Sequence, residues 1–464
     1  MSRPLVRAPA GTIVGTSVGD SVSRFLGIPY AQAPHGDARF RAPVRHPRFD
    51  DTFEADSYGP TPQRIPLFAS TTVPEPSIDG DDILNLNVFA PREGNGLPVM
   101  VWIHGGGYVA GSAASPWYDG SAFARDGVIL VSVSYRLGLD GFAFLDSTPT
   151  NLGLRDLICA LEWVQDNISA FGGDPDRVTI AGQSAGGGAV LALLASPLAV
   201  GLFSAAFSES GVIRTMTTDE AAASTAAVAD LLGVACTRDV LLTVSDTAAQ
   251  QAVRRLGELT ETALVLGPIC GDEVLPDDIV TGVSLRSPVP LLIGSTADEF
   301  DGGPTLEDPA RPHLDADTRA AARASGTRIT DSLFRAPCPQ VARARSGSAP
   351  TWAYSFEWVS PVTDGSTHCI DIPFFFDNLD QPGVPEAMGP TPPSELAQLM
   401  HRDVVEFVRN HALSWATTDG NPGDVARCYG GEEGAVANGS DVVDVPGAYD
   451  AVIMSTRTSA TTQL

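Results

Sequence analysis

Apolar and polar residues are arranged along this chain in two patterns, and each pattern predicts strands. Four runs are apolar throughout most of their length, which is typical of strands buried on both faces of a parallel sheet. These runs are residues 98–104, 128–134, 178–180 and 289–295. Residues 84–89 and 351–358 instead place apolar side chains at alternate positions, which is the period of a strand. Residues 1–30 predict an N-terminal hairpin sheet, and the proline- and glycine-rich stretch 31–80 predicts a loop.

Helical patterns lie between these strands. Residues 151–171 place apolar side chains on one helical face, and residues 396–415 form an amphipathic helix. The apolar stretch 189–195 and the alanine-rich stretch 221–256 also predict helices. Strands that alternate with helices predict an α/β fold with a large, mostly parallel central sheet covered by helices on both faces.

The domain organisation follows from length and local composition. A chain of 464 residues suggests about three domains, but one large α/β sheet with insertions accommodates the same length. We therefore expect a single domain over residues 1–464. Residues 301–350 predict a helical cap inserted in it, and residues 420–464 predict a partly irregular C-terminal tail.

Composition excludes several classes of function. The formal net charge of −27 opposes binding to nucleic acid and to anionic membranes. All 29 basic residues are arginine, so no lysine can act as a base or form a Schiff base. No apolar run is long enough to span a bilayer, and the N-terminus lacks the apolar segment of a signal peptide. The six cysteines are scattered, and together with the missing signal segment this predicts a cytoplasmic protein without a disulfide framework or zinc site.

The pentapeptide Gly182–Gly186 has the form G-x-S-x-G, with Ser184 at its centre. It lies between a predicted buried strand and a predicted apolar helix, which is the setting of a nucleophile elbow in an α/β-hydrolase fold. The helix N-terminus there favours developing negative charge. An ordinary strand-to-helix turn explains the pentapeptide alone equally well, so the partners of Ser184 must decide.

A serine nucleophile needs a histidine base and a carboxylate that orients it, and in α/β-hydrolases these follow the serine in the chain. Of the four later histidines, His368 lies in a loop after the strand predicted at 351–358, whereas the others lie on a helix or in the cap region. Asp298 and Glu299 both follow the strand predicted at 289–295, and their position alone permits either as the acid. His104-Gly-Gly-Gly107 follows another buried strand and offers backbone N–H groups for an oxyanion hole.

With these motifs the chain resembles the type-B carboxylesterases, from about residue 10 to residue 415. The resemblance is carried by many specific stretches. They include Phe25-Leu-Gly-Ile-Pro-Tyr-Ala31, Trp102-Ile-His-Gly-Gly-Gly107, Phe171-Gly-Gly-Asp-Pro175, the elbow, Ser210-Gly211, Asp298-Glu299 and His368 with Asp371-Ile-Pro373.

The resemblance implies specific roles. It assigns Ser184 as nucleophile, Glu299 as acid and His368 as base. The same comparison assigns the oxyanion donors, which are Gly106, Gly107 and Ala185, and a structural ion pair between Arg39 and Asp81. It implies a serine carboxylesterase that hydrolyses small esters through an acyl-enzyme, without metal or cofactor, as a monomer or small homo-oligomer.

Departures from the family pattern limit the choice of substrate. Ile83 stands where secreted members have a cysteine, and residues 57–80 contain no tryptophan that would bind choline. Gln183 replaces the commoner glutamate before the nucleophile, and Phe300 replaces a glycine and is expected near the pocket. The alternatives are a lipase acting on uncharged lipid esters and a non-catalytic binding protein on the same fold. An intact set of site residues disfavours the second.

Overall fold

The structure is a computed structural model that describes residues 3–66, 71–146, 148–260, 264–286, 288–300, 324–418, 425–431 and 442–446. Its centre is an 11-stranded sheet whose neighbouring strands from β13 to β8 are parallel, while the strands towards both edges are antiparallel. In sheet order the strands are β14 (Val442–Pro446), β13 (Val425–Tyr429), β12 (Thr351–Phe356), β11 (Leu291–Thr296), β10 (Ala205–Glu209), β9 (Gly173–Gln183), β7 (Leu97–Ile103), β8 (Ile129–Val133), β6 (Asn85–Pro91), β4 (Val22–Pro29) and β3 (Thr16–Val18). This arrangement confirms the predicted large, mostly parallel sheet.

A second, three-stranded sheet forms from the N-terminal segment. It comprises β1 (Leu5–Ala8), β2 (Gly11–Val14) and β5 (Phe53–Glu54). The first two strands form the antiparallel hairpin that the sequence predicts, and β5 adds in parallel to β2.

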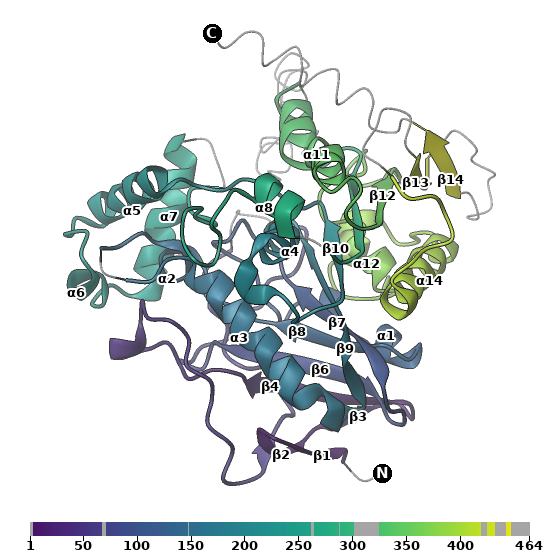
Figure 1. Ribbon diagram of the computed structural model, residues 1–464, viewed down its shortest axis with the longest axis horizontal. Helices are drawn as coiled ribbons and strands as arrows, with labels where there is room; N and C mark the ends of the chain where they lie inside the picture. Colours follow the sequence, from purple (N-terminus) through teal and green to yellow (C-terminus); the bar gives the residue numbers. More distant parts are fainter. Residues whose placement is uncertain are drawn as a thin grey trace.

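Helices cover both faces of the large sheet (Figure 1). One face packs against α3 (Leu152–Asn167) and α4 (Ala185–Ala195), and the other against α1 (Ser121–Arg125), α12 (Ile372–Phe375) and α14 (Ser394–Asn410). Strand β7 shows how the pattern arises. Val99, Val101 and Ile103 face the first layer, whereas Met100 and Trp102 face the second, because successive side chains of a strand point to opposite sides.

The remaining helices are short or lie away from the sheet. They are α2 (Gly138–Phe142), α5 (Thr218–Leu232), α6 (Arg238–Leu241), α7 (Asp246–Thr260), α8 (Ile279–Arg286), α11 (Pro337–Ala344) and α13 (Val384–Met388). Single turns form η1 (Gly36–Ala38), η2 (Pro116–Tyr118), η3 (Ile168–Phe171) and η4 (Pro197–Ala199), and η5 (Thr330–Arg335) is a π-helix. Figure 1 shows α5, α6 and α7 together at the side opposite β13 and β14.

The helix predicted over 221–256 is wrong as one element, because the chain breaks it into three. Helix α5 begins at a capping box between Thr217 and Glu220 and ends at Gly233, which has a φ of 69°. A residue in this left-handed conformation terminates a helix, and glycine adopts it without steric cost. The alanine-rich composition therefore predicts helical structure correctly, but it does not predict that the first helix ends at Gly233.

Two predicted regions are described only in part. Of the region predicted as a cap, residues 301–323 lie outside the described part, and the rest includes η5 and α11, which pack near β11. Of the predicted tail, β13 and β14 form strands at the edge of the sheet, and most other residues after 418 lie outside the described ranges. The single-domain organisation stays a prediction.

Candidate active site

Ser184 lies at a sharp turn between β9, which ends at Gln183, and α4, which begins at Ala185. Its backbone has φ 59° and ψ −122°, a strained conformation for a residue with a side chain. The Ser184 N–H donates to the Glu209 carbonyl at 2.9 Å, which holds the turn. A Cβ at Gly186 would lie 2.1 Å from the Ile103 carbonyl oxygen, so this turn requires glycine there.

The sheet brings the later segments to the same edge. Strands β9, β10, β11 and β12 are neighbours and parallel, so their carboxyl ends lie together. Glu299 lies just after β11 and His368 lies in the loop after β12. Residues far apart in sequence therefore converge near Ser184.

Glu299 contacts His368 directly. Its Oε2 accepts a hydrogen bond from His368 Nδ1, and its Oε1 accepts from Ser210 Oγ at 2.6 Å and from the Thr296 N–H at 2.9 Å. The carboxylate is fully buried. Asp298 instead accepts from the Ser366 N–H at 2.8 Å and so braces the loop that carries the histidine. Of the two candidate acids, only Glu299 has the geometry to orient His368.

His368 is enclosed by aromatic rings. The ring centroids of Phe300 and Phe334 lie 5.1 Å and 4.8 Å from that of His368. Phe300, expected near the pocket, thus packs on the histidine itself. Burial alone lowers the pKa of His368, but the adjacent Cys369 and Glu299 raise it, and the resulting pKa lies well above the ordinary value of 6.5. This environment favours the cationic form that a general base acquires.

The side-chain amide of Gln183 contacts the other ring nitrogen of His368. Its Nε2 lies 3.2 Å from His368 Nε2. In the neutral ring, Nδ1 donates to Glu299, so Nε2 carries the lone pair that accepts from the amide. The described structure contains no hydrogen bond between Ser184 and His368, and such bonds often tighten only in the complex with substrate. The sequence marked Gln183 only as a replacement and did not reveal this contact.

The glycine loop after β7 lies against the nucleophile. A Cβ at Gly105 would come within 2.9 Å of Gln183 Oε1 and 3.0 Å of Ser184 Cβ. Gly106 and Gly107 have φ values of 110° and 60°, and a Cβ at Gly106 would lie 2.2 Å from the Ala110 carbonyl oxygen. Ala185 is the first residue of α4, so its N–H has no acceptor within the helix. The three predicted oxyanion donors therefore lie on the two segments that flank Ser184.

Buried polar groups support this loop. His104 stacks on Tyr135 with a centroid distance of 4.7 Å, and the Tyr135 hydroxyl donates to the His104 carbonyl at 3.0 Å. Burial lowers the pKa of His104 to about 4, so its ring is neutral and structural. At the far end of the loop, the Gly111 N–H donates to Gln63 Oε1 at 2.5 Å.

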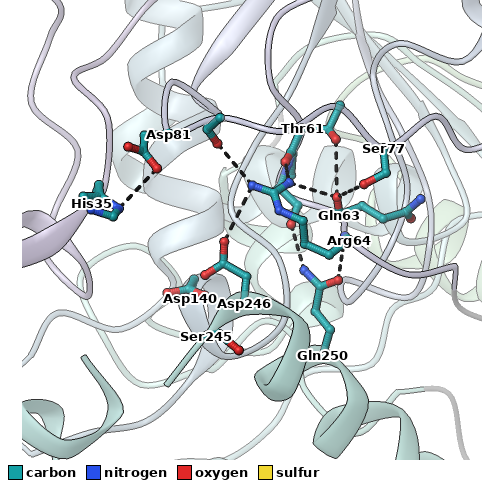
Figure 2. Close-up of polar contacts among 12 residues, drawn as sticks. His35, Thr61, Gln63, Arg64, Ser77, Asp81, Asp140, Ser245, Asp246 and Gln250 are labelled. Atoms are coloured by element: carbon teal, nitrogen blue, oxygen red, sulfur yellow. Dashed lines mark hydrogen bonds and ion pairs between the residues drawn. The ribbon is translucent and has the colours of Figure 1, made fainter. Parts of the chain in front are cut away.

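The predicted ion pair between Arg39 and Asp81 is wrong. Arg39 instead makes two hydrogen bonds to the Asp140 carboxylate, at 2.5 Å and 3.0 Å, and donates to the Val244 carbonyl. Asp81 lies at the surface and faces His35 at 3.3 Å (Figure 2). A buried guanidinium binds best to a carboxylate that matches its two parallel N–H groups, and Asp140 on α2 supplies it.

The same region joins the 61–81 loop to α7. Figure 2 shows Arg64 donating to backbone carbonyls of this loop and facing Asp246, which begins α7, at 3.6 Å. Gln250 of α7 donates to the Pro62 carbonyl at 2.8 Å. Gln63, which holds the glycine loop, is therefore anchored through α7.

Further residues at the site went unrecognised in the sequence. Ser210 and Asp371 belong to stretches that carry the family resemblance, but their roles were not assigned. Ser210 has a φ of 47° and donates to Glu299, and Asp371 precedes α12 on the loop that holds His368. The contact of Phe334 with His368 cannot be predicted from the sequence, because nothing near Phe334 relates it to a histidine 34 residues later.

Within the described ranges, no three histidine, cysteine, aspartate or glutamate side chains gather in an arrangement that would bind a metal ion. In the same part of the chain, every helix is too short or too polar to cross a bilayer.

Comparison with known proteins finds relatives along nearly the whole chain. Residues 2–314 match the model of the Carboxylesterase family. The para-nitrobenzyl esterase of Bacillus subtilis (strain 168) is 37% identical over 458 residues, which cover 91% of each chain. The phenmedipham hydrolase of Pseudarthrobacter oxydans is 33% identical over 449 residues, which cover 88% of this chain and 90% of that protein.

Solved structures agree. A thermophilic PNB esterase superposes with a TM-score of 0.81 at 33% identity and covers 92% of this chain and 96% of its own. The carboxylesterase EST55 of Geobacillus stearothermophilus also gives a TM-score of 0.81, at 30% identity, and covers 97% of this chain and 100% of its own. These similarities confirm the predicted α/β-hydrolase architecture.

Proposed function

Since the chain belongs to the carboxylesterase family, we propose that Ser184, Glu299 and His368 carry out its ester hydrolysis. The protein is a carboxylic ester hydrolase that acts on small ester substrates. The observation that best supports these roles is the buried hydrogen bond from His368 Nδ1 to Glu299, formed beside a strained serine turn.

In the proposed acylation step, Ser184 Oγ attacks the carbonyl carbon of the ester while His368 Nε2 removes its proton. The Gln183 amide leaves Nε2 as the Ser184 hydroxyl approaches it. Glu299 stays ionised and stabilises the imidazolium that forms. The tetrahedral intermediate then collapses, the bond to the leaving alkoxide breaks, and His368 returns the proton to it as the alcohol departs.

The N–H groups of Gly106, Gly107 and Ala185 stabilise the oxyanion of each intermediate. In deacylation, water gives a proton to His368 and attacks the acyl carbon. The second intermediate collapses to the carboxylic acid, and the proton on His368 returns to Ser184 Oγ. This restores the enzyme.

We infer from the relatives that the substrates include esters of the p-nitrobenzyl kind. A series of p-nitrophenyl esters of increasing acyl length tests the proposed function in wild type and in Ser184→Ala. Ser169→Ala, at an exposed position on η3, is the matched control. We expect Ser184→Ala to lose at least about 10³-fold in kcat, because nucleophilic attack is abolished.

A covalent probe adds a second readout. A p-nitrophenyl phosphonate reacts with an activated serine and releases p-nitrophenol, leaving a stable adduct. Mass spectrometry of the digested protein should find that adduct on the peptide that contains Ser184. Ester hydrolysis that survives in Ser184→Ala, or an adduct on another residue, contradicts the assignment.

A further inference from the structure

Three carboxyl groups are buried together behind His368. Glu209 ends β10, Glu299 follows β11, and Asp371 precedes α12, and each is fully shielded from solvent. Glu299 receives three hydrogen bonds, which occupy both of its carboxylate oxygens. Neither Glu209 oxygen receives a hydrogen bond from any N–H or O–H group of the described residues. An ionised carboxylate in that state is strongly disfavoured.

Asp371 Oδ1 likewise receives no hydrogen bond from the described residues, and the two carboxyl groups interact directly with each other. Two ionised carboxylates are acceptors only, so a hydrogen bond between them can form only if one of them holds a proton. Asp371 has another donor, because its Oδ2 accepts a hydrogen bond from the Tyr354 hydroxyl at 3.3 Å. The proton therefore belongs to Glu209, which has none.

We propose that Glu209 is a neutral carboxylic acid in the working enzyme and that its hydrogen bond to Asp371 positions His368 against Ser184. This inference rests on the proposed roles of those two residues. Glu209 is a positioning residue and takes no part in bond making.

Glu209 acts at both segments of the site. Its carbonyl accepts the Ser184 N–H at 2.9 Å. In the proposed protonation state its side chain donates to Asp371, three residues after His368. Between them, Cys369 has a φ of 74°, a conformation that a residue with a side chain adopts only when its surroundings enforce it. One residue thus connects the nucleophile turn to the strained loop that carries the base.

The surrounding charges make the proton difficult to lose. The titratable groups facing the pair are Cys369, Glu299, His368, Tyr118 and Tyr354. Among these groups only His368 becomes cationic. Burial raises the pKa of Glu209 well above its ordinary value, and the charge of Asp371 raises it further. Burial and the charge of Glu299 raise the pKa of Asp371 to about 7.

The sign of the pH effect follows. A carboxyl group whose folded pKa is raised contributes stability that is present below its unfolded pKa and is lost as pH rises through the folded value. When Glu209 ionises at alkaline pH, two adjacent carboxylates repel in the core, and the His368 loop is displaced. The pair therefore contributes to the alkaline limit of activity.

The activity test compares three enzymes. Glu209→Gln keeps a donor to Asp371 and stays neutral at every pH, whereas Glu209→Ala removes the donor. We expect Glu209→Gln to keep the wild-type kcat within about threefold near pH 7 and to remain active at higher pH than wild type. Glu209→Ala should lose about 10²-fold in kcat with KM little changed, because the base is misplaced.

The proposal is overturned if Glu209→Gln loses as much activity at neutral pH as Glu209→Ala. A Glu209→Gln variant that fails to fold also overturns it, because an isosteric neutral group should be tolerated where Glu209 is neutral. The thermal midpoint gives a parallel readout. The Tm of Glu209→Gln minus that of wild type should grow as pH rises, and a constant difference contradicts the raised pKa.

Infrared difference spectroscopy tests the proton itself, independently of catalysis. In a Ser184→Ala background, the spectrum at neutral pH should contain a carboxylic-acid C=O band that shifts in D₂O and disappears on Glu209→Gln. Asp298→Asn is the control and should leave the band in place. If the band is absent while Ser184→Ala is inactive, the inference fails and the proposed function stands. If Ser184→Ala is active, the proposed function fails whatever the spectrum shows.

Discussion

At the scale of single residues, the contact of Gln183 with His368 has a consequence for the proposed mechanism. The His368 ring must release the Gln183 amide before it can contact the Ser184 hydroxyl. The amide donates to Nε2, the nitrogen that we propose accepts the Ser184 proton. An amide is neutral, so it fixes the ring without adding charge beside the imidazolium. The family's commoner glutamate would add that charge. The identity of residue 183 is therefore expected to tune the pKa of His368.

Gln183→Glu should move the acidic limb of the kcat/KM profile to higher pH by about one unit. An anion within hydrogen-bond distance favours the protonated ring, and the base must be neutral to act. The profile on a p-nitrophenyl ester in buffers of constant ionic strength measures this shift. Gln32→Glu adds the same charge at an exposed position and should leave the limb unmoved. An unchanged profile in Gln183→Glu would refute the contact.

Glu299→Gln should lose about 10⁴-fold in kcat, because an amide no longer fixes the tautomer or stabilises the imidazolium. Asp298→Asn only weakens the hydrogen bond that the Ser366 N–H donates to this side chain, and it should lose about tenfold or less. Steady-state kinetics on one ester, with circular dichroism to verify folding, separates the two. The reverse order of losses would identify Asp298 as the acid.

At the scale of elements, the site is built from turns that follow strands. Each of β7, β9, β11 and β12 ends at a segment that contributes to it, and the glycines there allow backbone to approach backbone. Two separate constraints act at such glycines: the strain of a positive φ, and the steric clash that an added Cβ would make with neighbouring atoms. Gly106 combines a positive φ with a carbonyl 2.2 Å from a notional Cβ, whereas Gly19 has a positive φ and open space.

Gly106→Ala should therefore lower kcat by about 10²- to 10³-fold, as loss of an oxyanion donor does, since the added methyl group displaces the loop. Gly19→Ala is the matched control, because it meets only the strain of a positive φ and lies in a hairpin far from Ser184 along the chain. We expect its kcat to equal that of wild type. Equal losses in both variants would show that strain alone is responsible.

At the scale of the whole molecule, a buried ion pair ties the helical layer to the sheet. Arg136 follows β8 and binds Asp156 of α3 through Nε and Nη2 at 2.7 Å and 2.6 Å, and both side chains are almost fully buried. Removal of one partner leaves an uncompensated charge in the core. This pair therefore matters for the integrity of the fold rather than for chemistry.

Asp156→Asn should destabilise the protein by about 3–5 kcal/mol. Glu162→Gln removes one of the two carboxylates that pair with the exposed Arg45, and it should cost less than about 1 kcal/mol. Urea unfolding followed by tryptophan fluorescence, together with the thermal midpoint, compares the two. Similar losses in both variants would show that burial does not decide the cost.

The sequence predicts the sheet well because buried parallel strands need uninterrupted apolar runs, and such runs are few. The positions of Ser184 and His368 follow from the ends of those strands. Position alone did not choose Glu299 over Asp298, because the direction of a side chain after a strand depends on the folded turn. The family resemblance pairs Arg39 with Asp81, whereas the folded chain pairs it with Asp140, which lies about 100 residues away in sequence yet adjacent in space. The Gln183 and Glu209 contacts likewise join residues that only the assembled sheet brings together.

The order of strands from β9 to β14 has a consequence for biosynthesis. Each strand from β10 to β14 pairs with the strand that precedes it in the chain, so this half of the sheet can grow outward from β9 as the ribosome releases it. Until the next strand is released, the latest one is an open edge with unpaired N–H and C=O groups. His368 follows β12 in the chain, so a nascent chain becomes catalytically competent only after that strand has docked. Hydrolysis of a fluorogenic ester by stalled chains of increasing length would time the completion of the sheet.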